Sequence, residues 1–106
     1  MKKGTVYQII DRTNNNFYIG STVEPLNIRL SKHKSDYRRY NKGLTHYKGS
    51  YEIIKNNNFF IEEIETINFD DEIELRLLER DYILTTYEHN INNSVPLRNY
   101  KVCNTL

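Results

Sequence analysis

Residues 16–22, NFYIGST, are the part of the sequence from which the fold is most readily deduced. A similar stretch of β-branched and aromatic residues, TVYQII, occupies residues 5–10 and is followed at once by the turn-forming run DRTNNN. This pattern predicts an antiparallel hairpin with strands at 5–10 and 16–21. The pairing would bring Tyr7 and Tyr18 near one another, and Gly20 would keep the backbone open where the second strand ends.

Three later segments have helical patterns. A helix is expected over residues 25–39, because four residues fall on one face at helical spacing: Leu26, Leu30, His33 and Tyr37. A second helix is expected over residues 47–55, before the run NNN at 56–58. A third begins with Asp70 or Asp71 as its N-cap and carries an apolar stripe as far as Ile83.

One further strand is expected between the second and third helices. Residues 59–67, FFIEEIETI, predict a strand with Phe59, Ile61, Glu63 and Glu65 on one face and Phe60, Glu62 and Ile64 on the other. The element order is then ββααβα. It predicts an α+β fold in which a small, three-stranded, largely antiparallel sheet is flanked by helices.

The 106 residues are enough for one domain. We expect it to span residues 1–93, with a C-terminal tail at 94–106 that wraps the core or is partly mobile. No apolar run approaches the length of a membrane span, and the N-terminus lacks a signal peptide. The single cysteine, Cys103, excludes an internal disulfide. These features together predict an intracellular protein of the cytoplasm or nucleus.

Charge is distributed unevenly although the net charge is only +1. Residues 1–55 contain 11 Lys or Arg against 4 Asp or Glu, a balance of +7, and residues 56–106 have a balance of −6. The basic half suggests a surface for nucleic-acid phosphates, with Lys32, Lys34, Arg38 and Arg39 as its candidates. A solvated helix face is the alternative. The nine tyrosines suit either a nucleic-acid surface or an ordinary core.

Glu79 is the best candidate for a metal ligand. The three scattered histidines and one cysteine make a zinc site improbable, whereas Mg²⁺ or Mn²⁺ needs only one or two carboxylates. Glu79 lies within LRLLERDYI, the most apolar helical stretch, where a carboxylate is costly unless a cation or hydrogen-bond donor satisfies it. The alternative is a surface glutamate paired with Arg76 or Arg80.

Four other residues could take part in phosphoryl chemistry. Arg29 and His33 are spaced four apart on one helix face, where an arginine could stabilise phosphoryl charge and a histidine could move a proton. Tyr7 and Tyr18 could join a proton relay, but a tyrosine needs a cationic neighbour to act as a base. Each residue also has an ordinary structural role as an alternative: a surface cation, a partly buried helical histidine, or core tyrosines.

Taken in order, these segments resemble the GIY-YIG nuclease family. The resemblance covers residues 4–93 and rests on TVY at 5–7, YIG at 18–20, Arg29 with His33, and Glu79 in LLERDYI. Thr5 and Val6 depart from the usual Gly and Ile of the first tripeptide. The resemblance implies that Glu79 holds the metal, that Arg29 stabilises the phosphoryl transition state, and that Tyr7, Tyr18 and His33 move protons and position water. It also implies a matching asparagine after the glutamate helix, at Asn92 or Asn93.

The function implied is that of an endonuclease that hydrolyses phosphodiester bonds in DNA with one Mg²⁺ or Mn²⁺ ion. In that chemistry we expect the field of Arg29 to lower the pKa of a nearby tyrosine enough for it to accept a proton from water. A non-catalytic nucleic-acid or protein-binding module on the same fold is the main alternative, and an RNA-directed enzyme ranks lower. Since no base-reading motif is evident, a homodimer or a targeting partner could supply specificity.

Overall fold

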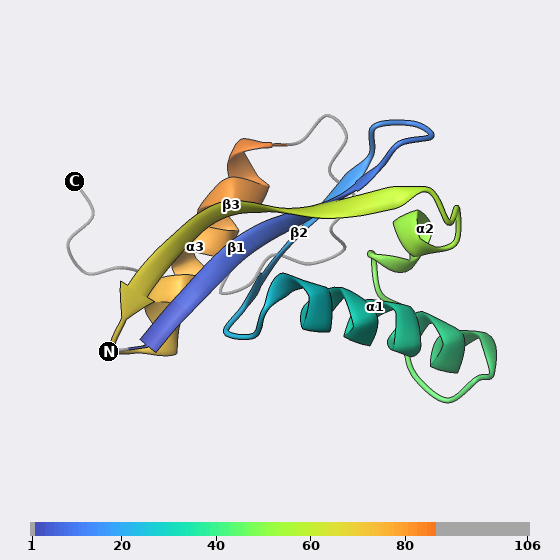
Figure 1. Ribbon diagram of the computed structural model, residues 1–106, viewed down its shortest axis with the longest axis horizontal. Helices are drawn as coiled ribbons and strands as arrows, with labels where there is room; N and C mark the ends of the chain where they lie inside the picture. The colour runs from blue at the N-terminus through green and yellow to red at the C-terminus, as the bar shows by residue number, and fades with distance from the viewer. Residues whose placement is uncertain (1, 87–106) are drawn as a thin grey trace.

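The computed structural model describes residues 2–86, which form a three-stranded antiparallel sheet and three helices (Figure 1). The elements are β1 (Lys2–Asp11), β2 (Phe17–Thr22), α1 (Leu26–Asn41), α2 (Tyr51–Ile54), β3 (Phe59–Phe69) and α3 (Glu72–Thr85). β1 is the central strand and pairs with both of the others. The expected α+β class and the ββααβα order are therefore confirmed.

The N-terminal hairpin forms as the sequence predicts. Tyr7 pairs with Gly20 and Ile9 pairs with Tyr18. Asn15 adopts a left-handed conformation (φ 64°) in the turn, which asparagine tolerates better than most residues. β1 begins three residues earlier than expected, because its first residues pair with the end of β3 rather than with the hairpin.

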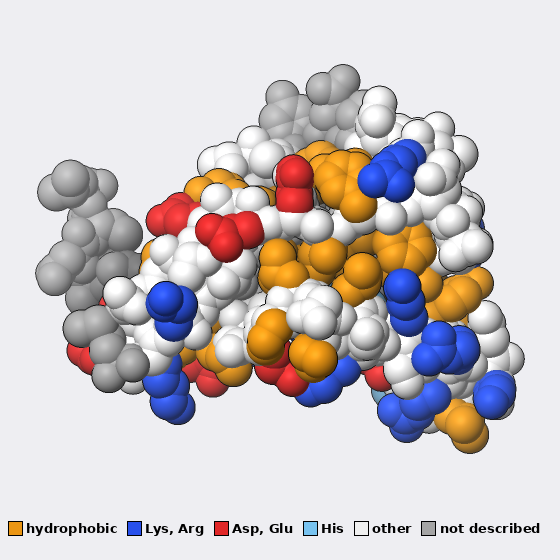
Figure 2. Space-filling view, in the orientation of Figure 1, with side chains coloured by type: hydrophobic (Ala, Val, Ile, Leu, Met, Phe, Trp, Pro, Cys, Tyr) orange, Lys and Arg blue, Asp and Glu red, His pale blue; other side chains and the backbone are white. Residues whose placement is uncertain are grey.

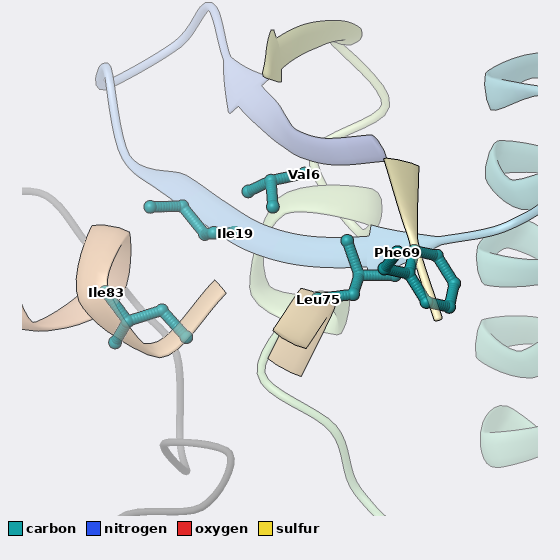
Figure 3. Packing of buried hydrophobic residues seen from close by; sticks show 5 residues of the cluster. All are labelled: Val6, Ile19, Phe69, Leu75 and Ile83. Carbon is teal, nitrogen blue, oxygen red and sulfur yellow. The ribbon is translucent and has the colours of Figure 1, made fainter. Parts of the chain in front are cut away.

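The helices cover opposite faces of the sheet. Val6 and Ile19 pack with Phe69 of β3 and with Leu75 and Ile83 of α3 (Figure 3). The neighbouring strand residue Tyr7 instead belongs to a second buried cluster with Ile9 and Ile53, against which Leu26 and Leu30 of α1 pack. Because successive strand residues point to opposite faces, α3 covers one face while α1 and α2 cover the other.

A bulge in β3 changes its expected face pattern. Val6 pairs with Glu65 but Tyr7 pairs with Glu63, so Ile64 is an extra residue in β3. The prediction that Glu65 shares a face with Phe59 and Ile61 is therefore wrong. Glu65 lies on the α3 side, where the Tyr82 hydroxyl donates a hydrogen bond to it at 2.6 Å.

The ends of α2 and α3 follow local sequence signals. α2 contains only Tyr51–Ile54 rather than the predicted 47–55, because Gly49 and Ser50 form a turn before it and glycine disfavours helix. The N-cap of α3 is Asp71, whose carboxylate accepts a hydrogen bond from the Ile73 N–H at 3.0 Å while Glu74 completes a capping box. Within residues 2–86, no helix has the length and apolar character needed to cross a membrane.

Candidate active site

Three polar side chains form a hydrogen-bonded row in the interior of the α1 side. Tyr7 Oη lies 2.7 Å from His33 Nε2, and His33 Nδ1 lies 3.2 Å from Ser50 Oγ. All three residues are at most 2% exposed. A neutral imidazole has one donor and one acceptor nitrogen, so a proton on Nδ1 directed at Ser50 leaves Nε2 to accept from the Tyr7 hydroxyl.

Burial keeps both ends of the Tyr7–His33 pair uncharged. It lowers the pKa of His33 to about 3, with smaller contributions in the same direction from Arg29 and Lys48. Burial also raises the pKa of Tyr7, and although Arg29 acts in the opposite direction, burial outweighs it. The expectation that Arg29 makes the resting tyrosine a base is therefore wrong for Tyr7, which is a neutral phenol near pH 7.

Gly20 provides the space that the Tyr7 ring occupies. A Cβ atom built at Gly20 would lie 2.6 Å from Tyr7 Cζ and closer still to the hydroxyl oxygen. The glycine is thus required by the close approach of a ring on the neighbouring strand rather than by backbone conformation. This contact fixes the phenol next to the end of β2.

Tyr18 also contacts the histidine. Its ring meets the His33 ring edge-on with centroids 5.6 Å apart, and the Tyr7 and His33 rings are arranged similarly at 5.9 Å. Burial raises the pKa of Tyr18, and the negative charge of Glu79 adds to that rise. Two phenols, one from each strand of the hairpin, therefore contact the His33 ring.

Glu79 is a buried carboxylate rather than a surface one. It is 5% exposed, and Ser21 Oγ donates a short hydrogen bond to its Oε1. The alternative pairing with Arg76 is present but loose, at 3.8 Å from a guanidinium that is itself half exposed. Burial raises the pKa of Glu79, opposed by the Ser21 hydrogen bond and by the charges of Arg76 and Arg29.

The positive charge of Arg29 reaches every one of these groups. It adds to the lowering of the His33 pKa, and it opposes the larger effect of burial that raises the pKa values of Tyr7, Tyr18 and Glu79. The five residues that the sequence singled out for chemistry are thus brought into one electrostatic neighbourhood. Arg29 is half-buried on the side of α1 that carries His33.

The predicted nucleic-acid-binding cations are exposed along α1. Lys32 pairs with Glu24 at 2.5 Å, and Arg39 lies 3.9 Å from Asp36. Lys34 and Arg38 border a separate pocket with Lys55. Asn92 and Asn93, the two asparagine candidates, lie outside the described residues, as does the predicted tail.

Sequence reasoning missed two serines. Ser21 belongs to the YIGST segment, but a hydroxyl partner for Glu79 becomes evident only when α3 is placed against β2. Ser50 follows a glycine in a loop and has no periodic signal to mark it. Its contact with His33 spans 17 residues of sequence, a separation over which local pattern carries no information.

Residues 2–86 form a small α+β domain in which the β1–β2 hairpin, α1 and α3 bring these side chains together. A family model described as the GIY-YIG catalytic domain matches residues 3–92, and the chain is therefore a member of the GIY-YIG nuclease family.

Two viral proteins are similar to this chain. It is 33% identical over 84 residues to protein 146R of Invertebrate iridescent virus 6, covering 78% of this chain and 33% of that protein. It is 36% identical over 83 residues to the uncharacterized protein 019R of the same virus, covering 78% of this chain and 29% of that protein. The chain thus spans about a third of the length of these relatives. No solved structure gives a significant match.

Proposed function

We propose that this protein is a metal-dependent endonuclease that hydrolyses phosphodiester bonds in DNA with one divalent ion, Mg²⁺ or Mn²⁺. The observation that carries the proposal is the convergence of two phenols, an imidazole and a buried carboxylate within the field of Arg29. Phosphodiester hydrolysis needs these components: a cation for the phosphoryl oxygens, groups that move a proton, and a ligand for a metal.

Glu79 is suited to hold the metal ion. Its carboxylate is buried and has a raised pKa, so its charge is incompletely compensated by Ser21 and Arg76. Among residues 2–86, no group of three or more His, Cys, Asp or Glu side chains could hold a metal. A single carboxylate fits Mg²⁺ or Mn²⁺, which retains several waters and takes further oxygens from a substrate phosphate. When bound, the ion would polarise the scissile phosphate.

Tyr7 and His33 are placed to move the proton of the attacking water. As the water oxygen bonds to phosphorus, its proton passes to Tyr7 Oη while the Tyr7 proton passes to His33 Nε2 across their 2.7 Å contact. The bond from phosphorus to the leaving oxygen then breaks, and that oxygen takes a proton from solvent. This relay requires a neutral imidazole and a neutral phenol at rest, which burial maintains.

Arg29 has two tasks in this scheme. Its guanidinium offsets the charge that develops on the equatorial phosphoryl oxygens. Its charge also opposes the rise that burial causes in the pKa of Tyr7, and so reduces the cost of passing negative charge through the phenol. Tyr18, whose ring meets the His33 ring edge-on, would help to position the attacking water.

Glu79→Gln tests the proposal directly. We expect this variant to lose nicking of supercoiled plasmid in Mg²⁺ and in Mn²⁺ while retaining its thermal midpoint, because glutamine keeps the shape and can still accept from Ser21. The matched control is Glu72→Gln, an exposed glutamate on the same helix, which should cut at the parent rate. Parent-like cutting by Glu79→Gln would refute the assigned role.

We propose that residues 1–93 are the nuclease domain, that the protein acts in the cytoplasm or nucleus where DNA is found, and that a homodimer or a targeting partner supplies specificity. The alternative is a binding module without catalysis. Plasmid binding without any cleavage across Mg²⁺, Mn²⁺ and other divalent ions would favour that alternative.

A further inference from the structure

A pocket separate from the candidate active site lies between α1, the end of α2 and the start of β3. It has a volume of about 250 Å³ and is lined by Lys34, Tyr37, Arg38, Ile54, Lys55, Asn57 and Phe59. Lys and Arg side chains gather over α1, at the lower right of Figure 2, and Lys34 and Arg38 of this helix line the pocket. On α1, Lys34 and Arg38 are four residues apart and form a stripe distinct from that of Arg29 and His33.

The pocket wall is cationic and contains no acidic residue. Three of its seven lining residues are Lys or Arg. Within residues 2–86, neither Lys34 nor Arg38 forms an ion pair with an acidic side chain, whereas Lys32 and Arg39 on the same helix do. Lys55 pairs with Glu52 on the helix surface at 3.2 Å. Three cations around one cavity favour a phosphate-bearing ligand.

The pocket also offers aromatic surface. Phe59 is half-buried, and Lys34 Nζ lies 5.6 Å from the centroid of its ring. Tyr37 contributes a second half-buried ring from α1. Cations that follow a phosphate backbone, combined with rings on which a base can stack, are the features by which proteins bind unpaired nucleotides. A base inside a duplex cannot present its face to such a ring.

We infer that this pocket binds one unpaired nucleotide of the nucleic-acid strand that the protein cleaves, with its phosphate among Lys34, Arg38 and Lys55 and its base against Phe59. This inference rests on the proposed function. Lys34 and Arg38 lie roughly 7 to 14 Å beyond Arg29 along the helix axis, at 1.5 Å per residue. That separation corresponds to roughly two to four nucleotides at the per-strand spacing of 3.4 Å. The pocket would therefore select DNA that is unpaired on one side of the cut.

The inference is tested by measuring how the full chain binds DNA in EDTA, where metal-dependent cleavage cannot occur. The probes are a fluorescein-labelled ten-nucleotide oligo(dT) and a labelled ten-base-pair duplex. Lys34→Gln and Arg38→Gln should each weaken oligo(dT) binding about tenfold and flatten the slope of log affinity against log salt by about 0.7. Phe59→Leu keeps an apolar side chain but removes the aromatic ring, and it should weaken oligo(dT) binding about fivefold or more.

The matched control is Lys42→Gln, an exposed cation at the end of α1 that does not line the pocket. Equal losses in Lys42→Gln and Lys34→Gln would overturn the inference, because they would indicate a diffuse basic surface. It would also be overturned by equal losses for duplex and oligo(dT), or by polyglutamate displacing oligo(dT) as well as unlabelled oligo(dT) does.

The same variants separate this inference from the proposed function. If the parent cuts plasmid while Lys34→Gln and Arg38→Gln bind oligo(dT) like the parent, the pocket assignment fails and the nuclease stands. If the parent cuts no DNA with any divalent ion but these variants lose oligo(dT) binding, the nuclease fails and the pocket remains a nucleotide site.

Discussion

The hydroxyl oxygen of Tyr7 and Nε2 of His33 lie 2.7 Å apart in the interior of the protein, although one residue comes from β1 and the other from α1. Neither side chain has appreciable contact with solvent. Burying a polar group costs free energy unless the group forms a hydrogen bond, and this contact provides a partner for both side chains. The same contact also places a proton acceptor behind the phenol, so structure and proposed chemistry depend on a single hydrogen bond.

Tyr7→Phe removes the hydroxyl and keeps the ring that packs against Ile9 and Ile53. We expect the nicking rate to fall by about 10²-fold or more, the usual contribution of a proton-transfer group. The thermal midpoint should fall by only a few degrees, because one hydrogen bond is lost. Plasmid nicking and circular dichroism measure the two effects.

Tyr82→Phe is the matched control for that substitution. Its hydroxyl also donates a hydrogen bond, to Glu65 at 2.6 Å, but this bond is only partly buried and lies on the α3 side of the sheet. This variant should lose no more stability than Tyr7→Phe and should nick at the parent rate. Equal rates for Tyr7→Phe and the parent would exclude Tyr7 from the relay.

Ser50 is expected to act as a positioning residue through His33. Ser50→Ala removes the partner of Nδ1, so the imidazole loses the contact that selects its tautomer. We expect a roughly tenfold lower nicking rate and a shifted pH profile, because His33 would then titrate in a different environment. A purely structural role would lower the thermal midpoint and leave the pH profile unchanged, and Ser50→Cys should restore part of the rate.

Gly20→Ala tests whether the position of the phenol matters. The new methyl group would overlap the Tyr7 ring, so we expect the tyrosine to move and the nicking rate to fall by about 10²-fold. Gly43→Ala provides a comparison, because Gly43 has a left-handed backbone (φ 75°) and open space around it. That variant should lose about 1 kcal/mol of stability through backbone strain and cut normally. If both variants cut normally, Gly20 is structural only.

Much of the fold follows from local sequence. The hairpin, the α1 face that carries His33, and the Asp71 cap of α3 each depend on residues close together in the chain, so short patterns predict them. The β3 bulge at Ile64 is different, because it is set by pairing with β1 some sixty residues earlier. An alternation pattern alone cannot locate it.

The candidate site is likewise predictable only in part from local sequence. The sequence indicates which side chains have suitable chemistry, but burial is a property of the assembled layers. Glu79 reads as a surface glutamate with arginine neighbours until α3 is placed against β2 and Ser21. Likewise, the field of Arg29 on Tyr7 is predictable in sign, whereas the larger opposing effect of burial depends on α1 covering the hairpin.

His33 should also make the stability of the protein depend on pH. Its environment contains the positive charges of Arg29 and Lys48, the negative charge of Asp36, and the neutral phenols of Tyr7 and Tyr18. Burial and the charges of Arg29 and Lys48, opposed by Asp36, lower the pKa of His33 in the folded state to about 3. An unfolded histidine has a pKa near 6.5, so between these values the unfolded chain binds the proton that the folded chain excludes.

We therefore expect the free energy of unfolding to be unaffected by His33 above about pH 6.5 and to fall by about 1 kcal/mol per pH unit as the pH drops from there toward 4. Urea unfolding at several pH values measures this slope for the parent and for His33→Asn, which cannot take up the proton. Other titrating groups, including Asp11 and Glu79, contribute to both curves, so the difference between the curves reports on His33. The parent curve should fall more steeply than the variant curve below pH 6.5. Parallel curves would mean that the pKa of His33 is the same in the folded and unfolded chains, so burial would not be what keeps the imidazole neutral for the proton relay. If His33→Asn is too unstable to measure, His33→Gln serves the same comparison.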